Sequence, residues 1–339
     1  MKAAVMHAPN KMIVEDVETP TPDPDQVLMA VKAVAICASD LHIFEEGHSS
    51  GTYPSGPLIL GHEFSGEVAE VGSEVTAFAP GDRVACEPSW HCGECEMCQR
   101  GLTNLCRNVI FPSFPDRDGA MAQYITVPDF SLAKLPENVS FIEGALVEPL
   151  GVGLHAVRLA DLVEGQDIAI LGAGTIGIAT LDIALAFGAG QAYVAEPREG
   201  RQAYPASLGA VVRDSAEDLE KLFEKQDSFP PVVFEASGGA TAFAESLQIT
   251  EAGGKAVIIG IPEPDEQVFS ARVPRRKELT VQFCRRSRNT LEDCLQMVAD
   301  GTVHASEYPV QTFSLDEASE AFAAAAAREG DMIRAVVEP

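Results

Sequence analysis

The chain has 339 residues, 46% of them apolar, which is long enough for two domains of ordinary size. Acidic residues outnumber basic ones by 51 to 24, giving a formal net charge of −27 at pH 7. So negative a surface would repel phosphates, and no apolar run reaches the length of a membrane span, so we expect neither nucleic acid nor a membrane as partner. The first residues lack the long apolar core of a signal peptide, and we expect a cytoplasmic protein.

The first chemically informative residues follow a run of short predicted strands at residues 1 to 35. Cys37, Ser39, Asp40 and His42 lie within six residues, which alone is also compatible with a local turn around a buried thiol. Soon afterwards the stretch GHEFSGEVAEVGSEV begins at residue 61 and supplies the adjacent pair His62 and Glu63. Imidazole and carboxylate groups are ligands that zinc favours, and the strand that follows would hold them on rigid backbone.

A cysteine-rich segment gives the sharpest metal signal. Four of the eight cysteines fall within fifteen residues, in the pattern C-x2-C-x2-C-x7-C. Such clustering in a chain without an export signal points to metal and not to disulfides. The spacing predicts a closed tetrahedral zinc site with no room for substrate, and an iron–sulfur cluster is the chemical alternative. The four residues are Cys92, Cys95, Cys98 and Cys106.

Glu148 lies in the apolar stretch from residue 143 to residue 156. A carboxylate buried there needs a partner, although it could also be an acid at the start of a helix near Pro149. We expect a helix over residues 151 to 159 that leads into the next domain.

The motif GAGTIG occupies residues 172 to 177. It follows an apolar run at 167 to 171, opens a helix-patterned segment at 175 to 187 and precedes a second apolar run that ends in Glu196. This order of strand, glycine turn, helix, strand and acid is typical of dinucleotide binding, although glycine turns also occur in other α/β domains. The N–H groups at the start of the helix would face the phosphates. The residues assigned to the cofactor are Gly172, Gly174, Thr175, Ile176, Gly177, Glu196 and Arg201.

The remaining sequence continues the α/β pattern. Apolar runs at 231 to 238, 253 to 260 and 279 to 283 read as further strands of a doubly wound parallel sheet. The segment from residue 290 onward reads as helix, strand, helix (residues 314 to 328) and strand.

The GHE stretch, the four-cysteine loop and the glycine motif together resemble the zinc-dependent medium-chain alcohol dehydrogenases. The resemblance implies that Cys37 and His62 bind a catalytic zinc, with Glu63 as a ligand or near neighbour and Glu148 beside the ion, directly or through water. It implies that Asp40 orients His62. The four-cysteine loop would hold a second, structural zinc.

Two further residues of the catalytic set come from the same resemblance. Ser39 would pass on the substrate proton and His42 would be the outer member of that relay, unless His42 is a surface or ribose-contacting residue.

The same resemblance implies an α/β protein of two domains. A GroES-like, β-rich catalytic domain would comprise residues 1 to 152 and 288 to 339, and a Rossmann domain residues 153 to 287. Members of the family form dimers or tetramers, so we expect a homodimer or homotetramer.

Within the family, the sequence favours the polyol (sorbitol-like) branch. Glu87-Pro88 and Glu148 support it, and the resemblance implies that Arg286 helps to bind substrate hydroxyls, unless it is a solvated surface residue. Threonine 3-dehydrogenase is the main alternative, but Ser89 stands where that branch commonly has a histidine. Other secondary alcohols, a zinc-free quinone-type reductase and a non-catalytic dinucleotide-binding protein remain as further alternatives.

The carboxylate of Glu196 favours NAD because it would repel a 2′-phosphate, whereas Arg198 and Arg201 would attract one.

Overall fold

The computed structural model describes residues 1–48, 53–114, 117–262, 265–327 and 330–339. Its contacts divide the chain into two compact units, one of residues 1–148 with 291–339 and the other of residues 149–290. The sequence places the domain boundaries after residues 152 and 287, and the assignment of these ranges to two domains stays a prediction. Among the described residues, no helix has both the length and the apolar character needed to cross a bilayer.

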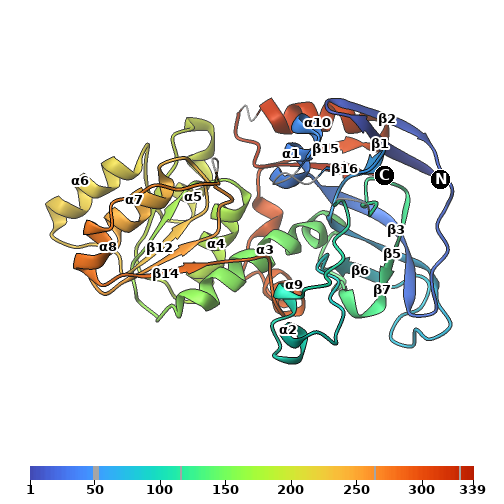
Figure 1. Cartoon of the computed structure of the whole chain (residues 1–339), viewed down its shortest axis with the longest axis horizontal. Helices are drawn as coiled ribbons and strands as arrows, with labels where there is room; N and C mark the ends of the chain where they lie inside the picture. Colours follow the sequence, from blue (N-terminus) through green and yellow to red (C-terminus); the bar gives the residue numbers. More distant parts are fainter. Residues whose placement is uncertain (49–52, 115–116, 263–264, 328–329) are drawn as a thin grey trace. The chain divides into compact units, whose positions relative to one another are not determined.

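The first unit is built on two β-sheets (Figure 1). In the described residues the larger sheet has the order β15-β16-β3-β5-β6-β8, with β7 also paired to β3, and the smaller has the order β2-β1-β4. Its helices are α1 (Ala38–Glu46), α2 (Glu96–Gln99), α9 (Leu291–Ala299) and α10 (Ala318–Ala327). The strands of the larger sheet are β3 (Gln26–Ala35), β5 (Glu63–Val71), β6 (Arg83–Cys86), β7 (Tyr124–Pro128), β8 (Leu132–Lys134), β15 (Val310–Ser314) and β16 (Arg334–Glu338). Those of the smaller are β1 (Lys2–Ala8), β2 (Lys11–Asp16) and β4 (Leu58–Ile59).

The C-terminal segment folds back onto the first strands of the chain. Strand β16 pairs antiparallel with β3, and α10 covers the same core, where the rings of Phe44 and Phe322 lie 4.9 Å apart. The predicted order of helix, strand, helix and strand is therefore confirmed. The last predicted helix begins as a single 3₁₀ turn at Leu315–Glu317 before α10, and its expected end at residue 328 lies outside the described residues.

The second unit is a doubly wound parallel sheet of the Rossmann type, as the sequence predicts. Its strand order is β11-β10-β9-β12-β13-β14. The chain leaves the central β9 first toward β10 and later toward β12, so the reversal point lies at the carboxyl end of β9, where such sheets bind ligands. The strands are β9 (Ile168–Leu171), β10 (Ala192–Ala195), β11 (Val211–Arg213), β12 (Val232–Glu235), β13 (Lys255–Ile258) and β14 (Thr280–Phe283).

Helices cover both faces of this sheet. Leu219 and Phe223 of α6 and Ile249 of α7 pack on Ala169 and Leu171. On the opposite face, Gly177 of α4 lies close to Ile170. The helices of this unit are α4 (Thr175–Ala186), α5 (Ala203–Ser207), α6 (Ala216–Gln226), α7 (Ala242–Ile249) and α8 (Arg272–Lys277).

Helix α3 (Phe141–Ala160) is longer than the sequence predicts, because it begins ten residues before the expected start at 151 and runs through Pro149. Ser140 and Glu143 form its reciprocal cap: the Ser140 N–H donates to Glu143 Oε2 at 2.8 Å, and the Glu143 N–H donates to Ser140 Oγ at 3.2 Å. Glu148 therefore lies inside the helix, and its interpretation as a helix-start acid is wrong.

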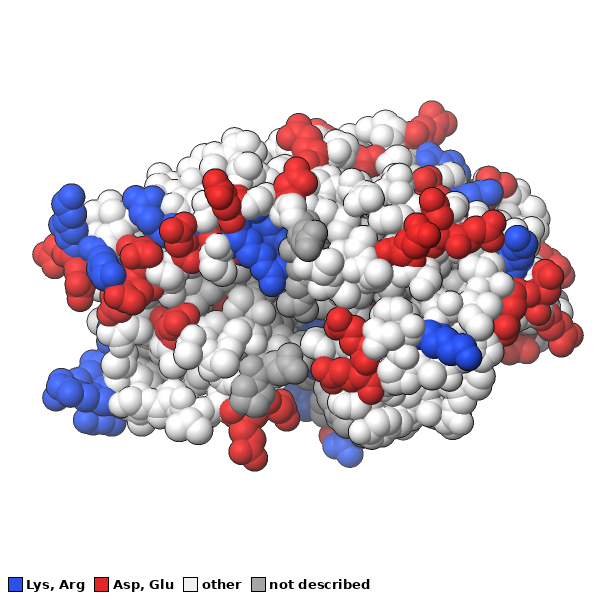
Figure 2. Space-filling view, turned by 90° about the horizontal axis from the view of Figure 1, so that it is seen from above, with Lys and Arg blue, Asp and Glu red and all other residues white. Residues whose placement is uncertain are grey.

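The acidic residues are spread along the sequence and do not form one tail. Figure 2 shows Asp and Glu side chains in several separate groups on one face, with Lys and Arg between them. This distribution fits a solvated acidic surface.

Candidate active site

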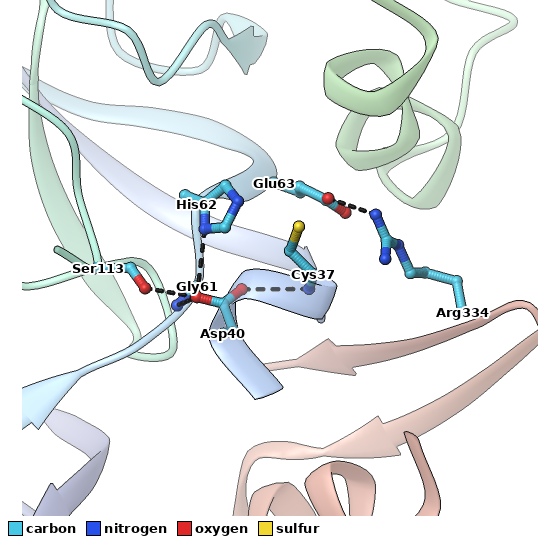
Figure 3. Close-up of polar contacts among 7 residues, drawn as sticks. All are labelled: Cys37, Asp40, Gly61, His62, Glu63, Ser113 and Arg334. Atoms are coloured by element: carbon cyan, nitrogen blue, oxygen red, sulfur yellow. Dashed lines mark hydrogen bonds and ion pairs between the residues drawn. The ribbon is translucent and has the colours of Figure 1, made fainter. Parts of the chain in front are cut away.

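Three of the expected metal ligands come together in the first unit. Cys37 follows β3 and precedes α1, while His62 and Glu63 lie at the start of β5. The antiparallel register places Ala35 opposite Glu63, which brings the two chain segments side by side. One ligand atom from each of Cys37, His62 and Glu63 lies within 4.8 Å of the other two (Figure 3).

Asp40, on the first turn of α1, holds this group together. Its Oδ2 accepts the Cys37 N–H at 3.1 Å, and its Oδ1 accepts the Gly61 N–H at 3.2 Å. The same Oδ1 lies 3.2 Å from His62 Nδ1. A carboxylate can only accept, so Asp40 fixes the proton on Nδ1 and leaves Nε2 as the ligand atom of His62.

The charges in this buried group favour the ionised forms of Asp40 and Cys37. Burial acts to raise the pKa of Asp40, but the His62 ring, Ser113 and the Cys37 N–H outweigh it, so the pKa is lowered. Burial also opposes ionisation of Cys37, yet attraction to His62 and then to Arg334 lowers its pKa to about 7. A thiolate is the form in which cysteine binds metal, and it is substantially populated near neutral pH.

Glu63 and Arg334 form a buried ion pair behind the ligand group. Arg334 Nη2 contacts Glu63 Oε1, and both side chains are almost fully buried, at 7% and 0% exposed. The second oxygen of Glu63, Oε2, is buried without a hydrogen-bond partner among the described residues. Because an orphaned buried acceptor costs free energy, this oxygen beside a thiol and an imidazole fits a metal ion.

Glu148 is not part of the group formed by Cys37, His62 and Glu63, but the charge of Glu63 affects its pKa. Burial, followed by the charge of Glu63, raises the pKa of Glu148 to about 8. The side chain is only 9% exposed. At neutral pH the protonated carboxyl could donate or accept a hydrogen bond.

The proposed proton relay lies on α1. Ser39 is partly buried on its first turn. His42 Nδ1 lies 4.0 Å from Glu46 Oε1 on the same helix, with the His42 side chain 31% exposed. The relay role of both residues stays a prediction.

The four-cysteine loop forms a second metal-ligating group. The Sγ atoms of Cys95 and Cys98 are 3.5 Å apart, those of Cys95 and Cys106 are 3.8 Å apart, and those of Cys92 and Cys106 are 3.5 Å apart. These separations are far too long for disulfides and suit four thiolates around one ion. Backbone N–H groups also point at the sulfurs: Cys95 N lies 3.4 Å from Cys92 Sγ, and Asn108 N lies 3.4 Å from Cys106 Sγ.

The glycine motif forms the turn between β9 and α4. Gly172 has φ +97, a conformation that disfavours side chains, and a Cβ on Gly177 would lie 1.9 Å from Gly172 O. Above Gly174, by contrast, a Cβ would meet only Arg201 Nη1, at 3.8 Å. Open space at the N-terminus of a helix suits a phosphate.

Glu196 follows β10, and its side chain hydrogen-bonds the backbone of the glycine turn. Its Oε2 accepts the Ala173 N–H at 2.8 Å, and its Oε1 accepts the Arg198 N–H at 2.9 Å. The carboxylate therefore lies at the carboxyl edge of the sheet, next to the glycine turn. Arg286 follows β14 with its backbone in the left-handed region (φ 54), and its substrate role stays a prediction.

Sequence reasoning missed three residues of these sites: Arg334, Ser113 and Glu235. Glu235 Oε1 accepts from Ser237 N and Gly238 N, and Ser237 lies beside Gly172 of the glycine turn. An arginine within the apolar run of β16 and an acid ending the apolar run of β12 were local signals of buried charges. Ser113 gave no such signal, because its importance depends on a contact with Asp40, 73 residues earlier in the chain.

A GroES-like unit with a Cys/His/Glu centre, combined with a dinucleotide-type sheet, defines a zinc-dependent dehydrogenase. Comparison with known proteins places the chain within that class. Residues 23–137 match the family described as "Alcohol dehydrogenase GroES-like domain", and residues 175–300 match "Zinc-binding dehydrogenase". The chain belongs to the zinc-containing medium-chain alcohol dehydrogenase superfamily, in its sorbitol dehydrogenase-like branch, and acts on CH–OH groups with NAD or NADP.

Three similar proteins match this chain over 94% to 100% of its length. Sorbitol dehydrogenase of Bacillus subtilis is 34% identical over 345 residues, covering 100% of this chain and 97% of that protein. Human sorbitol dehydrogenase is 33% identical, covering 94% and 90%. The structure of 2R,3R-butanediol dehydrogenase from Bacillus subtilis superposes with a TM-score of 0.90 at 30% identity, covering 100% of this chain and 99% of that one. These relatives do not show a particular closeness to threonine 3-dehydrogenase.

Proposed function

We propose that the protein oxidises a secondary hydroxyl of a polyol or sugar alcohol to a ketone, transferring hydride to NAD and releasing one proton. The observation that carries this proposal is the convergence of Cys37, His62 and Glu63 within 4.8 Å, where Glu63 offers an unpartnered oxygen. Relatives named as sorbitol dehydrogenases and as a plant L-idonate 5-dehydrogenase support a substrate with several hydroxyls.

In this proposal Cys37, His62 and Glu63 hold the catalytic zinc, and Glu148 completes its surroundings directly or through water. The four cysteines of the 92–106 loop hold a structural zinc. When bound, zinc supplies Lewis acidity toward a hydroxyl oxygen, and nicotinamide accepts the hydride.

The protein's own groups prepare the site for this chemistry. Asp40 fixes the tautomer and orientation of His62 through the contact to Nδ1. Arg334 pairs with Glu63, and both side chains are almost fully buried. Glu148, protonated near neutral pH, can hydrogen-bond a substrate hydroxyl. Ser39 and His42 would carry the released proton to solvent.

A substrate panel tests the assignment. NAD reduction would be followed with sorbitol, xylitol, arabinitol, galactitol and L-threonine under the same conditions. We expect turnover of one or more polyols and little with L-threonine. Turnover of L-threonine alone would overturn the polyol assignment and favour threonine 3-dehydrogenase.

The adenosine end of the cofactor is a separate question. Glu196 would repel a 2′-phosphate, whereas Arg198 and Arg201 flank the same turn with positive charge. We propose that the carboxylate prevails and that kcat/KM is at least about tenfold higher with NAD than with NADP. Equal values would show that the arginines decide the preference.

Zinc content separates the enzyme from a non-catalytic dinucleotide-binding protein. We expect about two zinc ions per chain, one per ligand group. Cys37→Ala should abolish turnover and lose one of them while leaving the fold intact. A folded Cys37→Ala variant with full activity would refute the catalytic assignment, and a protein that binds no zinc would refute the enzyme proposal.

A further inference from the structure

The loop from Ile110 to Ala120 is joined to the chain segment that carries the metal ligands. Ile59 N donates to Asp118 Oδ1 at 3.0 Å, and Gly119 N donates to Ile59 O at 2.7 Å. Ala120 N donates to Gly61 O at 2.8 Å, immediately before His62. The ring of Phe111 also lies 4.9 Å from the ring of His62. The described part of this loop therefore packs against the catalytic centre.

Ser113 occupies an unfavourable backbone conformation in this loop. Its φ is +72, in the left-handed region of backbone conformation that residues other than glycine rarely adopt. The residue is 1% exposed, and its N–H donates to Arg117 O at 2.8 Å. Such strained residues persist only where the surroundings hold them in place, and they concentrate at functional sites.

The Ser113 hydroxyl donates to Asp40 Oδ1 at 2.5 Å. The same oxygen faces Gly61 N and His62 Nδ1, each at 3.2 Å, so the serine makes the shortest contact to it. Figure 3 shows Ser113 and Cys37 on opposite sides of the Asp40 carboxylate. Because Asp40 is fully buried, its orientation depends on these few donors.

We propose that Ser113 is a positioning residue of the catalytic metal centre. Its hydroxyl holds the carboxylate of Asp40 in the one orientation that reaches both His62 Nδ1 and the Cys37 N–H. This inference rests on the proposed function, because it takes Cys37 and His62 as zinc ligands. It adds a residue that contacts neither ligand yet sets the geometry of both. The left-handed backbone of Ser113 accompanies the contact of its hydroxyl with Asp40.

Two substitutions separate the hydroxyl from the backbone strain. Ser113→Ala removes the hydroxyl and keeps a Cβ at positive φ. Ser113→Gly removes the hydroxyl and also relieves the strain, since glycine accepts this conformation freely. Ser131→Ala is the matched control: Ser131 is also buried in the same unit, at 4% exposed, and its hydroxyl donates to Pro128 O at 2.6 Å and not to Asp40.

The test is zinc retention, measured by elemental analysis after incubation with graded chelator. Cys37→Ala should lose only the catalytic zinc. Comparing its zinc content with that of the parent protein therefore identifies the catalytic ion. For both Ser113 variants we expect the catalytic zinc to dissociate at a lower chelator concentration than in the parent protein, by up to roughly tenfold, because losing a direct partner of a metal ligand costs about 10- to 100-fold in affinity and Ser113 acts one contact further out, through Asp40. Ser131→Ala should retain it. In the Ser113 variants kcat should fall while KM for NAD stays unchanged, because the cofactor residues belong to the other unit.

If Ser113→Gly retains the catalytic zinc as the parent does, or if Ser131→Ala loses it equally, the inference is wrong. If instead the parent and Cys37→Ala contain the same amount of zinc, the proposed function fails, which is a distinguishable result. Retention of the second zinc and an unchanged circular dichroism spectrum would establish that each variant is folded.

Discussion

Arg334 and Glu63 form an ion pair in the interior of the GroES-like unit, although 271 residues separate them in the chain. The pair exists because β16 lies beside β3, which in turn pairs with β5. Burial raises the pKa of Glu63 well above its ordinary value, while Arg334 acts in the opposite direction. The last strand of the chain thus supplies a positive charge that offsets part of the cost of ionising this carboxylate beside the metal ligands.

Replacing Arg334 should therefore be costly. Arg334→Met keeps much of the side-chain volume but leaves Glu63 buried without its partner, and we expect a loss of about 3–5 kcal/mol in unfolding free energy. The double variant with Glu63→Gln should recover part of this loss, because no buried charge remains. Denaturant unfolding of the zinc-free protein measures both. A loss under about 1 kcal/mol for Arg334→Met would show that the pair contributes little.

Glu148 should make the stability of the zinc-free protein depend on pH. Its pKa is about 8 in the folded chain against an ordinary value of 4.5, so between these values the folded state holds a proton that the unfolded state has lost. Stability should then fall as pH rises from 4.5 to 8, by about 5 kcal/mol if this group acts alone. Glu148→Gln should remove that part of the slope. Parallel slopes for parent and variant would contradict the raised pKa.

We expect Glu235 to affect the affinity for the cofactor, because it orders the loop beside the glycine turn. It ends β12, and its Oε1 accepts from Ser237 N and Ser237 Oγ, both at 2.7 Å, and from Gly238 N at 2.9 Å. A Cβ on Gly172 would lie 2.9 Å from Ser237 Cβ, so the loop that Glu235 holds supports the glycine turn directly.

Losing these charge-assisted bonds in Glu235→Ala should weaken NADH binding by about tenfold or more. Glu235→Gln keeps an acceptor oxygen and should bind nearly as well as the parent. Fluorescence titration with NADH measures both dissociation constants. If a folded Glu235→Ala variant binds NADH as tightly as the parent, the loop does not need this carboxylate.

The sequence was most informative where the structural cause is local. The glycine turn is fixed by contacts within a few residues, as the 1.9 Å approach to Gly172 O at position 177 illustrates. The four-cysteine spacing likewise defines its own loop. The Rossmann and GroES-like fold classes, predicted from strand runs and family resemblance, are confirmed.

The features that the sequence did not predict depend either on which distant strands become neighbours or on a local signal that was missed. No pattern near Glu63 indicates Arg334, because their contact depends on which strands become neighbours. Ser113 has the same explanation. The expected start of α3 at residue 151 was wrong for a different reason. The cap formed by Ser140 and Glu143 was a local signal in the sequence, and Pro149 lies inside the helix.

The four-cysteine loop should contribute to stability and not to the chemical step. Backbone N–H groups at Cys98 and Arg107 lower the pKa of Cys95 to about 6, which prepares this thiol for metal at neutral pH. Apart from the short helix α2 and one 3₁₀ turn at Thr103–Leu105, the loop has little regular structure of its own, so metal binding would supply much of its ordering free energy.

Cys95→Ala should lose one zinc ion, become more susceptible to limited proteolysis within residues 92–106, and unfold at a lower temperature. Its catalytic zinc should remain, and kcat of the folded fraction should stay within a few-fold of the parent value, because these thiolates leave no position open for substrate. Cys284→Ala, which removes a cysteine outside the loop, is the matched control and should keep its full zinc content. An unchanged zinc content in Cys95→Ala would contradict the structural-site assignment. Loss of both ions from a folded Cys95→Ala variant would show that the two metal groups are coupled.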